Sequence, residues 1–170
     1  MELYSSPNHG GKRGTTKGVV VHSTRSGKDV TPQQEYKATI NHFMNPSPST
    51  EEHPEGDPSA AVSAHIVIGT ERGYLAKLVE PDYEAWHCRE LNQTMLGVEL
   101  VQAHATDEFT AFQYVTLANL VKAWSLKYGF PLDRAHIVGH EETVPGKRDH
   151  KSDPGKMFDW DRFMSIVEAL

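Results

Sequence analysis

The sequence predicts an α/β fold, in which one central mixed β-sheet is flanked by helices in a single domain. Apolar runs typical of strands and segments with helical spacing alternate along the whole chain. The 170 residues, of which 38% are hydrophobic, are typical of one domain and supply one core. We expect this domain to occupy residues 18–170, after a lead-in segment, residues 1–17, that shows no periodic pattern.

The first half of the domain begins with an apolar, β-branched segment, 18–23, that is typical of a strand buried on both faces. A helix is expected from Thr31, as the cap, with Pro32 in its first turn. It runs to about Met44 and stops before Pro46. Its buried stripe at helical spacing consists of Tyr36, Ile40 and Phe43.

A long loop is predicted over residues 45–60, which contain four prolines among Ser, Glu and Gly. A loop of this length is either a tolerated insertion or part of the rim of a binding groove, and the sequence favours neither. His53 lies within it without an apolar anchor, so its side chain is expected to face solvent.

The second half continues the alternation of strands and helices. Residues 63–69 and 73–79 form a predicted hairpin whose turn contains Gly73. The remaining predicted elements are a strand over 96–102, a helix over 107–128 ended by Gly129, a strand over 135–138 and a helix over 158–170.

Composition excludes several classes of protein. A net charge of -6 provides no electrostatic footprint for nucleic acid. No apolar run is long enough to cross a bilayer, so no membrane insertion is expected. The N-terminus lacks the pattern of a signal peptide, and the single cysteine, Cys88, excludes an internal disulfide. We expect synthesis in the cytoplasm and a monomer.

Residues 137–155 change from a strand end into a loop rich in Gly, Pro and charge. His140 lies where the apolar run stops, and Asp153 lies before Pro-Gly; both are candidate zinc ligands. His22 ends the first strand and is the candidate third ligand. Lys151, two residues before Asp153, would point a cation into the same pocket.

Each candidate ligand also has a structural interpretation. His22 could be a satisfied core histidine, His140 could cap a loop, and Asp153 could form an Asx-type turn. Two imidazoles and one carboxylate would leave a bound zinc with a net charge near +1, which suits catalysis more than structure.

Glu99 is a charged residue inside an apolar strand, on the face opposite Val98 and Leu100. A carboxylate there is costly unless it faces a wet or metal-containing pocket. The alternative is a glutamate paired with a buried arginine.

The chain resembles the zinc-dependent N-acetylmuramoyl-L-alanine amidases, a fold shared with the peptidoglycan recognition proteins. Five segments carry the resemblance, in the order of the family: Val21–Thr24, Val62–Gly69, Ala85–His87, Leu96–Leu100, and Gly139–His140 with Lys151–Gly155. The resemblance implies a Zn²⁺ site formed by His22, His140 and Asp153. Because these segments extend over nearly the whole chain, we expect no separate wall-binding domain in it.

The resemblance further implies a role for each residue of the site. Glu99 acts as the general base and Lys151 stabilises the oxyanion. His65 and His87 contact the substrate or orient a ligand. After His87 the sequence departs from the family, and Arg89 could contact a peptide carboxylate or lie on the surface. Some branches carry a tyrosine at the position of Ala64, so a tyrosine-assisted mechanism is not expected.

The expected reaction is hydrolysis of the amide between the lactyl group of N-acetylmuramic acid and L-alanine of the stem peptide. The expected substrate is peptidoglycan or a muropeptide, and the preferred setting is a phage endolysin that acts on the cell wall after release. Three alternatives remain: a cytosolic muropeptide-recycling amidase, a non-catalytic peptidoglycan-binding module, and a zinc endopeptidase.

Overall fold

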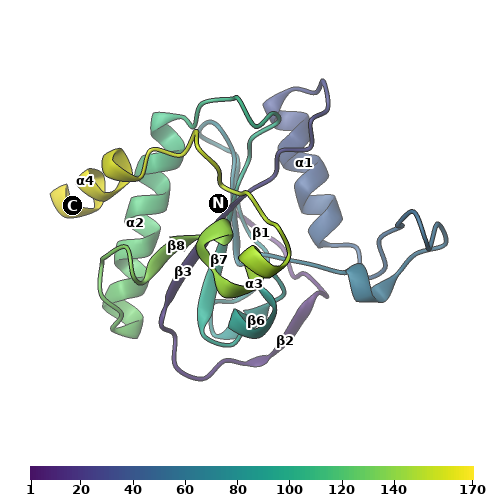
Figure 1. The fold of residues 1–170 in the computed structure, drawn as a ribbon, viewed down its shortest axis with the longest axis horizontal. Coiled ribbons are helices and arrows are strands. Elements are labelled where there is room, and N and C mark those ends of the chain that lie inside the picture. The colour runs from purple at the N-terminus through teal and green to yellow at the C-terminus, as the bar shows by residue number, and fades with distance from the viewer.

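A six-stranded sheet forms the centre of the computed structural model, which describes residues 1–170 (Figure 1). The strands are β1 (Glu2–Leu3), β2 (His9–Lys12), β3 (Gly18–Ser23), β4 (Ile66–Ile68), β5 (Leu75–Lys77), β6 (Tyr83–Ala85), β7 (Met95–Leu100) and β8 (Ile137–Gly139). The helices are α1 (Pro32–Phe43), α2 (Ala111–Tyr128), α3 (Val144–Arg148) and α4 (Trp160–Ala169).

The strand order of the main sheet is β1-β5-β4-β7-β3-β8. Strand β3 pairs in parallel with β7 and β8, whereas β4 pairs in parallel with β7 and antiparallel with β5. The predicted mixed sheet is therefore confirmed. All six residues of β3 are buried, because this strand has neighbours on both edges and covered faces above and below.

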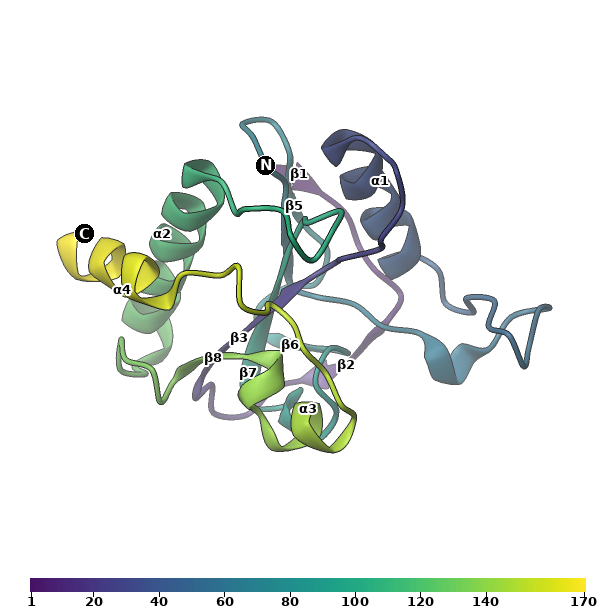
Figure 2. The same ribbon diagram turned by 45° about the horizontal axis from the view of Figure 1, so that its top comes forward.

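Helices cover the two faces of the sheet unequally. On one face, α2 and α4 pack together and share an 18-residue core cluster with β3, β4, β7 and β8. On the other face, α1 packs on β4 and β5 through a smaller cluster of 8 residues. Figures 1 and 2 show α2 and α4 on one side of the strands and α1 on the other.

The pleat of β3 and β7 decides where the polar residues go. Val98 and Leu100 point into the α2 cluster, so Glu99 points to the opposite face, as predicted. His22 and Glu99 are register partners in the parallel pair. The two side chains therefore start side by side at the carboxyl ends of the central strands, on the face that α2 leaves open.

The sequence predicted the start of α1 and the end of α2, but not the start of α2. Thr31 caps α1 in a reciprocal box with Gln34, as the sequence indicated. Helix α2 begins at Ala111 and not at residue 107, because Thr110 supplies the cap and bonds Gln113 in the same way. Gly129 ends α2 in the left-handed conformation, with φ 79°, as predicted.

Several predicted elements are shorter in the structure. Strands β4 and β5 do form an antiparallel hairpin, but only three residues of each are in the ladder. β7 ends at Leu100, β8 starts at Ile137 and α4 starts at Trp160. Before β8, the amides of residues 136 and 137 donate to the carbonyl of Asp133 instead of joining the sheet. Before α4, Asp159 acts as the N-cap, so the helix starts after it.

Two segments predicted to lack regular structure contain some. Within residues 1–17, β1 adds a parallel edge strand beside β5, and β2 forms a two-stranded ribbon with β6 (Figure 2). Within 137–155, Thr143 caps the short helix α3. All three elements are too short to show a periodic pattern, and the pairing partners of β1 and β2 are distant in sequence. The sequence therefore did not reveal them.

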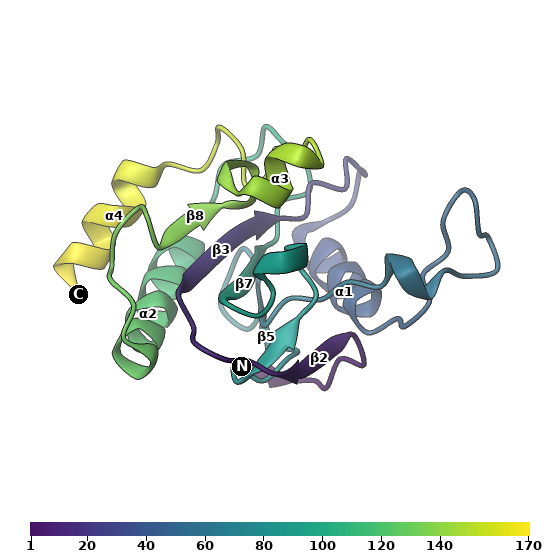
Figure 3. The ribbon, with the colours of Figure 1, turned by 60° about the horizontal axis from the view of Figure 1, so that its bottom comes forward.

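The Pro-rich segment 45–60 is a loop, as predicted, apart from a single turn of 3-10 helix at Pro58–Ala60. It extends away from the sheet beyond α1 (Figures 1 and 3). His53 is exposed and contacts Glu55. No helix of the chain has the length and apolar character that crossing a bilayer requires.

Candidate active site

A cavity of about 530 Å³ opens at the carboxyl ends of β3 and β7, on the face opposite α2. Its polar and charged side chains come mainly from four parts of the chain: the end of β3 and the residues that follow it, the segment after β6, the carboxyl end of β7, and the segment from η3 (His140–Glu142) to residue 153. The side chains that matter chemically are His22, Arg25, His87, Glu99, His140, Lys151 and Asp153.

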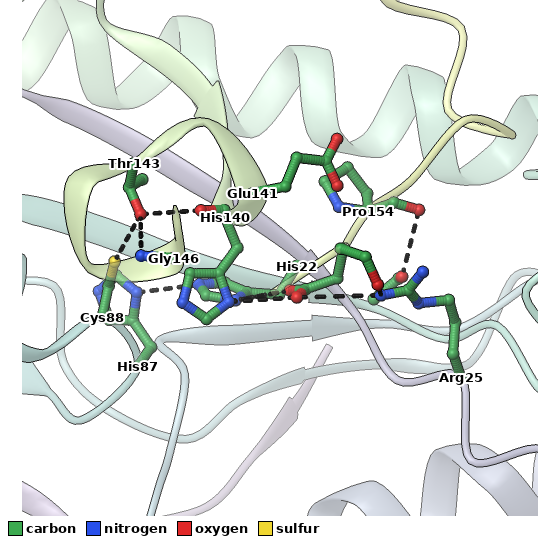
Figure 4. Close-up of polar contacts among 12 residues, drawn as sticks. His22, Arg25, His87, Cys88, His140, Glu141, Thr143, Gly146 and Pro154 are labelled. Atoms are coloured by element: carbon green, nitrogen blue, oxygen red, sulfur yellow. Dashed lines mark hydrogen bonds and ion pairs between the residues drawn. The ribbon is translucent and has the colours of Figure 1, made fainter. Parts of the chain in front are cut away.

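His22, His140 and Asp153 form a compact group that could hold a metal ion. The Nδ1 atoms of the two histidines lie 3.2 Å apart, and each lies 3.1 Å from Oδ2 of Asp153 (Figure 4). Tetrahedral zinc with ligands at 2.0–2.1 Å would place its ligand atoms about 3.3 Å apart. The spacing of these three atoms therefore fits a tetrahedral cation.

Hydrogen bonding behind His22 fixes which of its nitrogens carries a proton. Nε2 of His87 lies 3.1 Å from the carbonyl oxygen of Met95, which can only accept, so His87 carries its proton on Nε2. Nδ1 of His87 is then an acceptor, and Nε2 of His22, 3.0 Å away, donates to it. Burial holds the pKa values of both histidines below the usual range, so both rings are neutral.

It follows that Nδ1 of His22 carries a lone pair, and that this lone pair faces the carboxylate of Asp153. Burial opposes ionisation of Asp153, whereas contact with the imidazole of His140 lowers the pKa of its carboxyl. A lone pair against an anion is repulsive without a cation between them. The residues present therefore fit a divalent metal ion better than they fit hydrogen bonding alone.

His140 is held in place by the turn that follows β8. Its carbonyl accepts a hydrogen bond from Oγ1 of Thr143 at 2.8 Å, and the same hydroxyl accepts from the amide of Gly146 at 2.9 Å (Figure 4). A Cβ at Gly146 would collide with that carbonyl. Glycine is thus required for α3 to approach His140 closely.

Asp153 is fixed by a second set of backbone bonds. Its carbonyl oxygen accepts from the amide of Glu141 at 3.0 Å, and the Glu141 carboxylate accepts from the amide of Gly155 at 3.0 Å. The loop that carries Asp153 is in this way tied to the turn that carries His140. The two candidate ligands, 13 residues apart, are thereby linked through hydrogen bonds of the backbone.

Glu99 lies beside the candidate metal ligands and is 9% exposed. Burial raises the pKa of its carboxyl well above the usual value, and the negative charge of Asp153 raises it further. The charges of His140 and Arg25 act in the opposite direction. A strand carboxylate with a raised pKa in a polar cavity has the properties of a group that accepts and returns a proton.

Two cationic side chains line the same cavity. Lys151 lies on the rim, and its amide is held by the carbonyl of Gly146 at 2.8 Å. Arg25 was not identified from the sequence, although it follows His22 by three residues at the end of the same strand. A basic residue directly beyond a strand end that carries a candidate ligand was the signal that could have revealed it.

The three candidate substrate-binding residues have different positions. His87 lines the cavity, and its ring stacks edge-on beside that of His22. His65 is 0% exposed; its Nδ1 accepts from the amide of Gly97 at 2.9 Å and its Nε2 donates to the carbonyl of Tyr83 at 3.0 Å. A substrate contact by His65 is not supported, because burial and both hydrogen bonds leave it no free group.

Arg89 also lies outside the cavity. Its side chain is 63% exposed and forms an ion pair with Asp149. The expected contact of Arg89 with a peptide carboxylate is therefore not supported either, and the alternative of a surface residue agrees with its position. Sequence adjacency to His87 suggested the contact, but the turn after β6 directs the two side chains apart.

The fold and this site define a hydrolase with a candidate metal centre, and comparison with known proteins agrees. Residues 12–156 match the family model described as N-acetylmuramoyl-L-alanine amidase. The match spans most of the chain, so this chain belongs to the N-acetylmuramoyl-L-alanine amidase family and is an enzyme of the amidase class. The family resemblance is confirmed, and a purely non-catalytic module is set aside.

Two relatives illustrate the similarity. N-acetylmuramoyl-L-alanine amidase A of Achromobacter lyticus is 26% identical over 97% of this chain and 90% of its own length. The 1,6-anhydro-N-acetylmuramyl-L-alanine amidase AmpD of Salmonella typhimurium is 32% identical over 62% of this chain and 57% of its own length. The sequence match thus spans little more than half of that relative.

Solved structures match over more of the chain. A selenomethionine derivative of AmpD has a TM-score of 0.75 at 27% identity, covering 98% of this chain and 93% of that one. AmiD from E. coli, solved with anhydro-N-acetylmuramic acid-L-Ala-D-gamma-Glu-L-Lys, has a TM-score of 0.65 at 19% identity, covering 91% of this chain and 58% of that one. The likeness to AmiD shows the fold alone.

Proposed function

We propose that this enzyme is a zinc amidase that hydrolyses the bond between the lactyl group of N-acetylmuramic acid and L-alanine in soluble muropeptides. The observation that carries the proposal is the group of His22, His140 and Asp153 beside Glu99. In its printed name, AmpD acts on a 1,6-anhydro-N-acetylmuramyl-L-alanine amide, and AmiD was solved with such a muropeptide. These names support a recycling-type substrate more than the endolysin setting expected from the sequence.

Zinc is proposed because two imidazoles and one carboxylate form a donor set typical of catalytic zinc, with one position left for substrate or water. When bound, the ion supplies a Lewis acid for the scissile carbonyl. His87, which accepts from Nε2 of His22, keeps the opposite nitrogen of His22 directed at the site.

The chain's own residues then perform the proton transfers. Glu99 accepts a proton from the attacking water as the new C–O bond forms, and returns it to the nitrogen of L-alanine as the C–N bond breaks. The ammonium of Lys151, on the cavity rim, stabilises the negative charge that develops on the carbonyl oxygen. The second proton of the water leaves the new carboxylic acid and is taken up by the amine, so the products are a lactyl carboxylate and the ammonium group of L-alanine.

The test is to incubate the purified protein with anhydro-N-acetylmuramic acid-L-Ala-D-γ-Glu-L-Lys and to identify the products by mass spectrometry. Reactions with a chelator, and with zinc added back, run in parallel. We expect release of an intact tripeptide that begins with L-alanine, loss of this product with chelator, and its return with zinc.

Other products would give other conclusions. A shortened peptide still attached to the sugar would make the enzyme an endopeptidase. Rapid solubilisation of intact cell walls, with slow hydrolysis of the soluble muropeptide, would restore the endolysin setting. No cleavage of either substrate by the zinc-loaded protein would overturn the proposed function.

A further inference from the structure

Arg25 has a backbone conformation that the surrounding structure imposes. Its φ is 44°, in the left-handed region that residues with a Cβ adopt at a cost. Its amide donates to the carbonyl of Gln102 at 2.7 Å, and Thr24 and Gln102 exchange two further bonds of 2.8 and 3.0 Å. These bonds fix the chain at the carboxyl ends of β3 and β7 and place the side chain of Arg25 over the cavity.

The guanidinium of Arg25 has more donors than the protein uses. Nη2 donates to Oγ of Ser152 at 3.1 Å, and this is its only hydrogen bond to the protein. Nε is buried without a partner, and the whole side chain is only 19% exposed. A guanidinium has five N–H donors, and a buried donor left unpaired is costly. The group is therefore placed to receive an acceptor from a ligand.

Asp153 does not account for this position. Nη2 of Arg25 lies 3.9 Å from Oδ1 of Asp153, which is too long for a hydrogen bond. Both oxygens of Asp153 already lie within 3.2 Å of His140. The pair contributes charge, but it leaves the directional donors of Arg25 free.

We propose that Arg25 binds the free carboxylate of the second residue of the stem peptide and so selects substrates that carry it; this inference rests on the proposed function. In the muropeptide bound to AmiD, the second residue is D-γ-Glu. Its γ-linkage leaves the α-carboxylate free, one residue beyond the scissile amide. That carboxylate lies about two Cα spacings, roughly 7 Å, from the reacting carbon.

Chemistry and position agree with this assignment. The planar guanidinium matches a carboxylate through two parallel hydrogen bonds, which an ammonium cannot form. Lys151, the other cationic side chain of the cavity, is assigned to the oxyanion. Arg25 therefore remains to bind the α-carboxylate of D-γ-Glu. Nη2 of Arg25 lies 3.9 Å from Oδ1 of the candidate ligand Asp153, so the guanidinium is near the candidate metal site, as a contact roughly 7 Å from the reacting carbon requires.

The experiment compares two substrates that differ in one group: anhydro-N-acetylmuramic acid-L-Ala-D-γ-Glu-L-Lys and the same compound with the α-carboxylate replaced by a carboxamide. For Arg25→Gln, we expect kcat/KM on the carboxylate substrate to fall about 10- to 100-fold, the range for a charged hydrogen bond. On the carboxamide we expect a change below about 3-fold. Arg25→Lys should fall between the wild type and Arg25→Gln.

Arg148→Gln is the matched control, because Arg148 is exposed, is paired with Glu90 and does not line the cavity. It should match the wild type on both substrates. Equal losses for Arg25→Gln on the two substrates, together with weaker zinc binding in a chelator competition, would overturn the proposal and make Arg25 a positioning residue for Asp153. Equal kcat/KM of the wild type on the two substrates would also overturn it.

Failure of the proposed function is distinguishable from failure of this inference. If the wild type cleaves neither compound, calorimetric titration of the zinc-loaded protein with each compound tests Arg25 directly. Weaker binding of the carboxylate form alone in Arg25→Gln would support the inference, and equal affinities of the wild type for the two forms would overturn it.

Discussion

Glu99 is the residue on which the proposed chemistry depends most directly. Replacing it with Gln keeps the shape of the side chain and removes its ability to take a proton. We expect kcat to fall about 10²- to 10⁴-fold, the range for loss of a general base, with little change in KM. The measurement is steady-state hydrolysis of the muropeptide, with zinc content determined by elemental analysis.

Zinc content separates loss of the base from loss of the metal. The Glu99→Gln protein should hold as much zinc as the wild type, because the three candidate ligands are untouched. Glu80→Gln, at an exposed residue paired with Lys77, serves as the control and should keep full activity. Wild-type activity in Glu99→Gln would remove Glu99 from the mechanism.

His87 acts behind the metal site, through His22. Replacing His87 with Phe removes the acceptor for Nε2 of His22 but keeps a ring in the space that Gly97 leaves open, where a Cβ would lie 2.6 Å from the imidazole. We expect zinc affinity to fall about 10- to 100-fold, as for other partners of metal-bound histidines. Competition with a fluorescent chelator measures this.

The control for His87 is His53→Phe, because His53 lies on the exposed loop. Zinc affinity should not change in this variant. Nitrogen-15 spectra of the zinc-loaded wild type should show His22 protonated on Nε2. Protonation on Nδ1 would contradict the tautomer derived from the Met95 carbonyl.

The lowered pKa of buried His65 should make the free energy of unfolding depend on pH. Burial, aided by the charge of Arg13, lowers the pKa of His65 to about 3, whereas an unfolded histidine has a pKa near 6.5. The unfolded state thus binds more protons between these values. The contribution of neutral His65 is fully present above pH 6.5 and is lost as the pH falls toward 3, by about 1.4 kcal/mol per pH unit.

Gln at position 65 can accept from the amide of Gly97 and donate to the carbonyl of Tyr83 without titrating in this range. The free energy of unfolding, measured in urea from pH 7 to pH 4 with excess zinc, should therefore fall less steeply in His65→Gln than in the wild type. Parallel slopes would show that His65 is already protonated in the folded protein or stays neutral in the unfolded one.

At the scale of elements, the short helix α3 decides where His140 lies. Gly146→Ala would force a methyl group against the His140 carbonyl and push the helix and the ligand apart. We expect a loss of about 1–3 kcal/mol in unfolding free energy, the range for overpacking, together with weaker zinc binding. Urea unfolding and chelator competition measure the two effects.

Gly14→Ala is the matched control, because a Cβ at Gly14 meets no atom within 4 Å. It should leave both quantities unchanged. Wild-type zinc affinity in Gly146→Ala would show that α3 does not set the position of His140.

Helix ends illustrate what local sequence specifies. Thr31 with Gln34 was recognisable as a cap because a capping box acts within one turn. The equivalent pair Thr110 and Gln113 is just as local. The mixed apolar and polar residues before it led to a predicted start of α2 at residue 107, which is too early. The paired strands β1 and β5 lie more than 70 residues apart, and no local pattern reveals such a partner.

At the scale of the whole molecule, the candidate metal site joins segments that are far apart in the sequence. β3 carries His22, while the segment after β8 carries His140 and Asp153. An ion bound only by the folded protein stabilises it by about 2.7 kcal/mol at a concentration of 100 Kd. For a domain of this size, that is a rise in Tm of about 5–10 °C.

Thermal unfolding with zinc and with chelator measures this shift. In Asp153→Asn, which keeps the shape of Asp153 and removes its charge, the shift should largely disappear. An equal Tm with and without chelator in a wild type that is shown to bind zinc would mean that the unfolded chain binds the ion as tightly.

The sequence by itself determined the α/β class, the family, the main helices and the three candidate ligands with Glu99, because each follows from a strand end, a cap or a short motif. The alternation of β7 also placed Glu99 on the correct face. Only the tertiary structure decided that His65 is buried, that Arg89 points away, and that Arg25 enters the cavity. Those outcomes depend on distances between segments far apart in the chain, which neither periodicity nor sequence adjacency encodes.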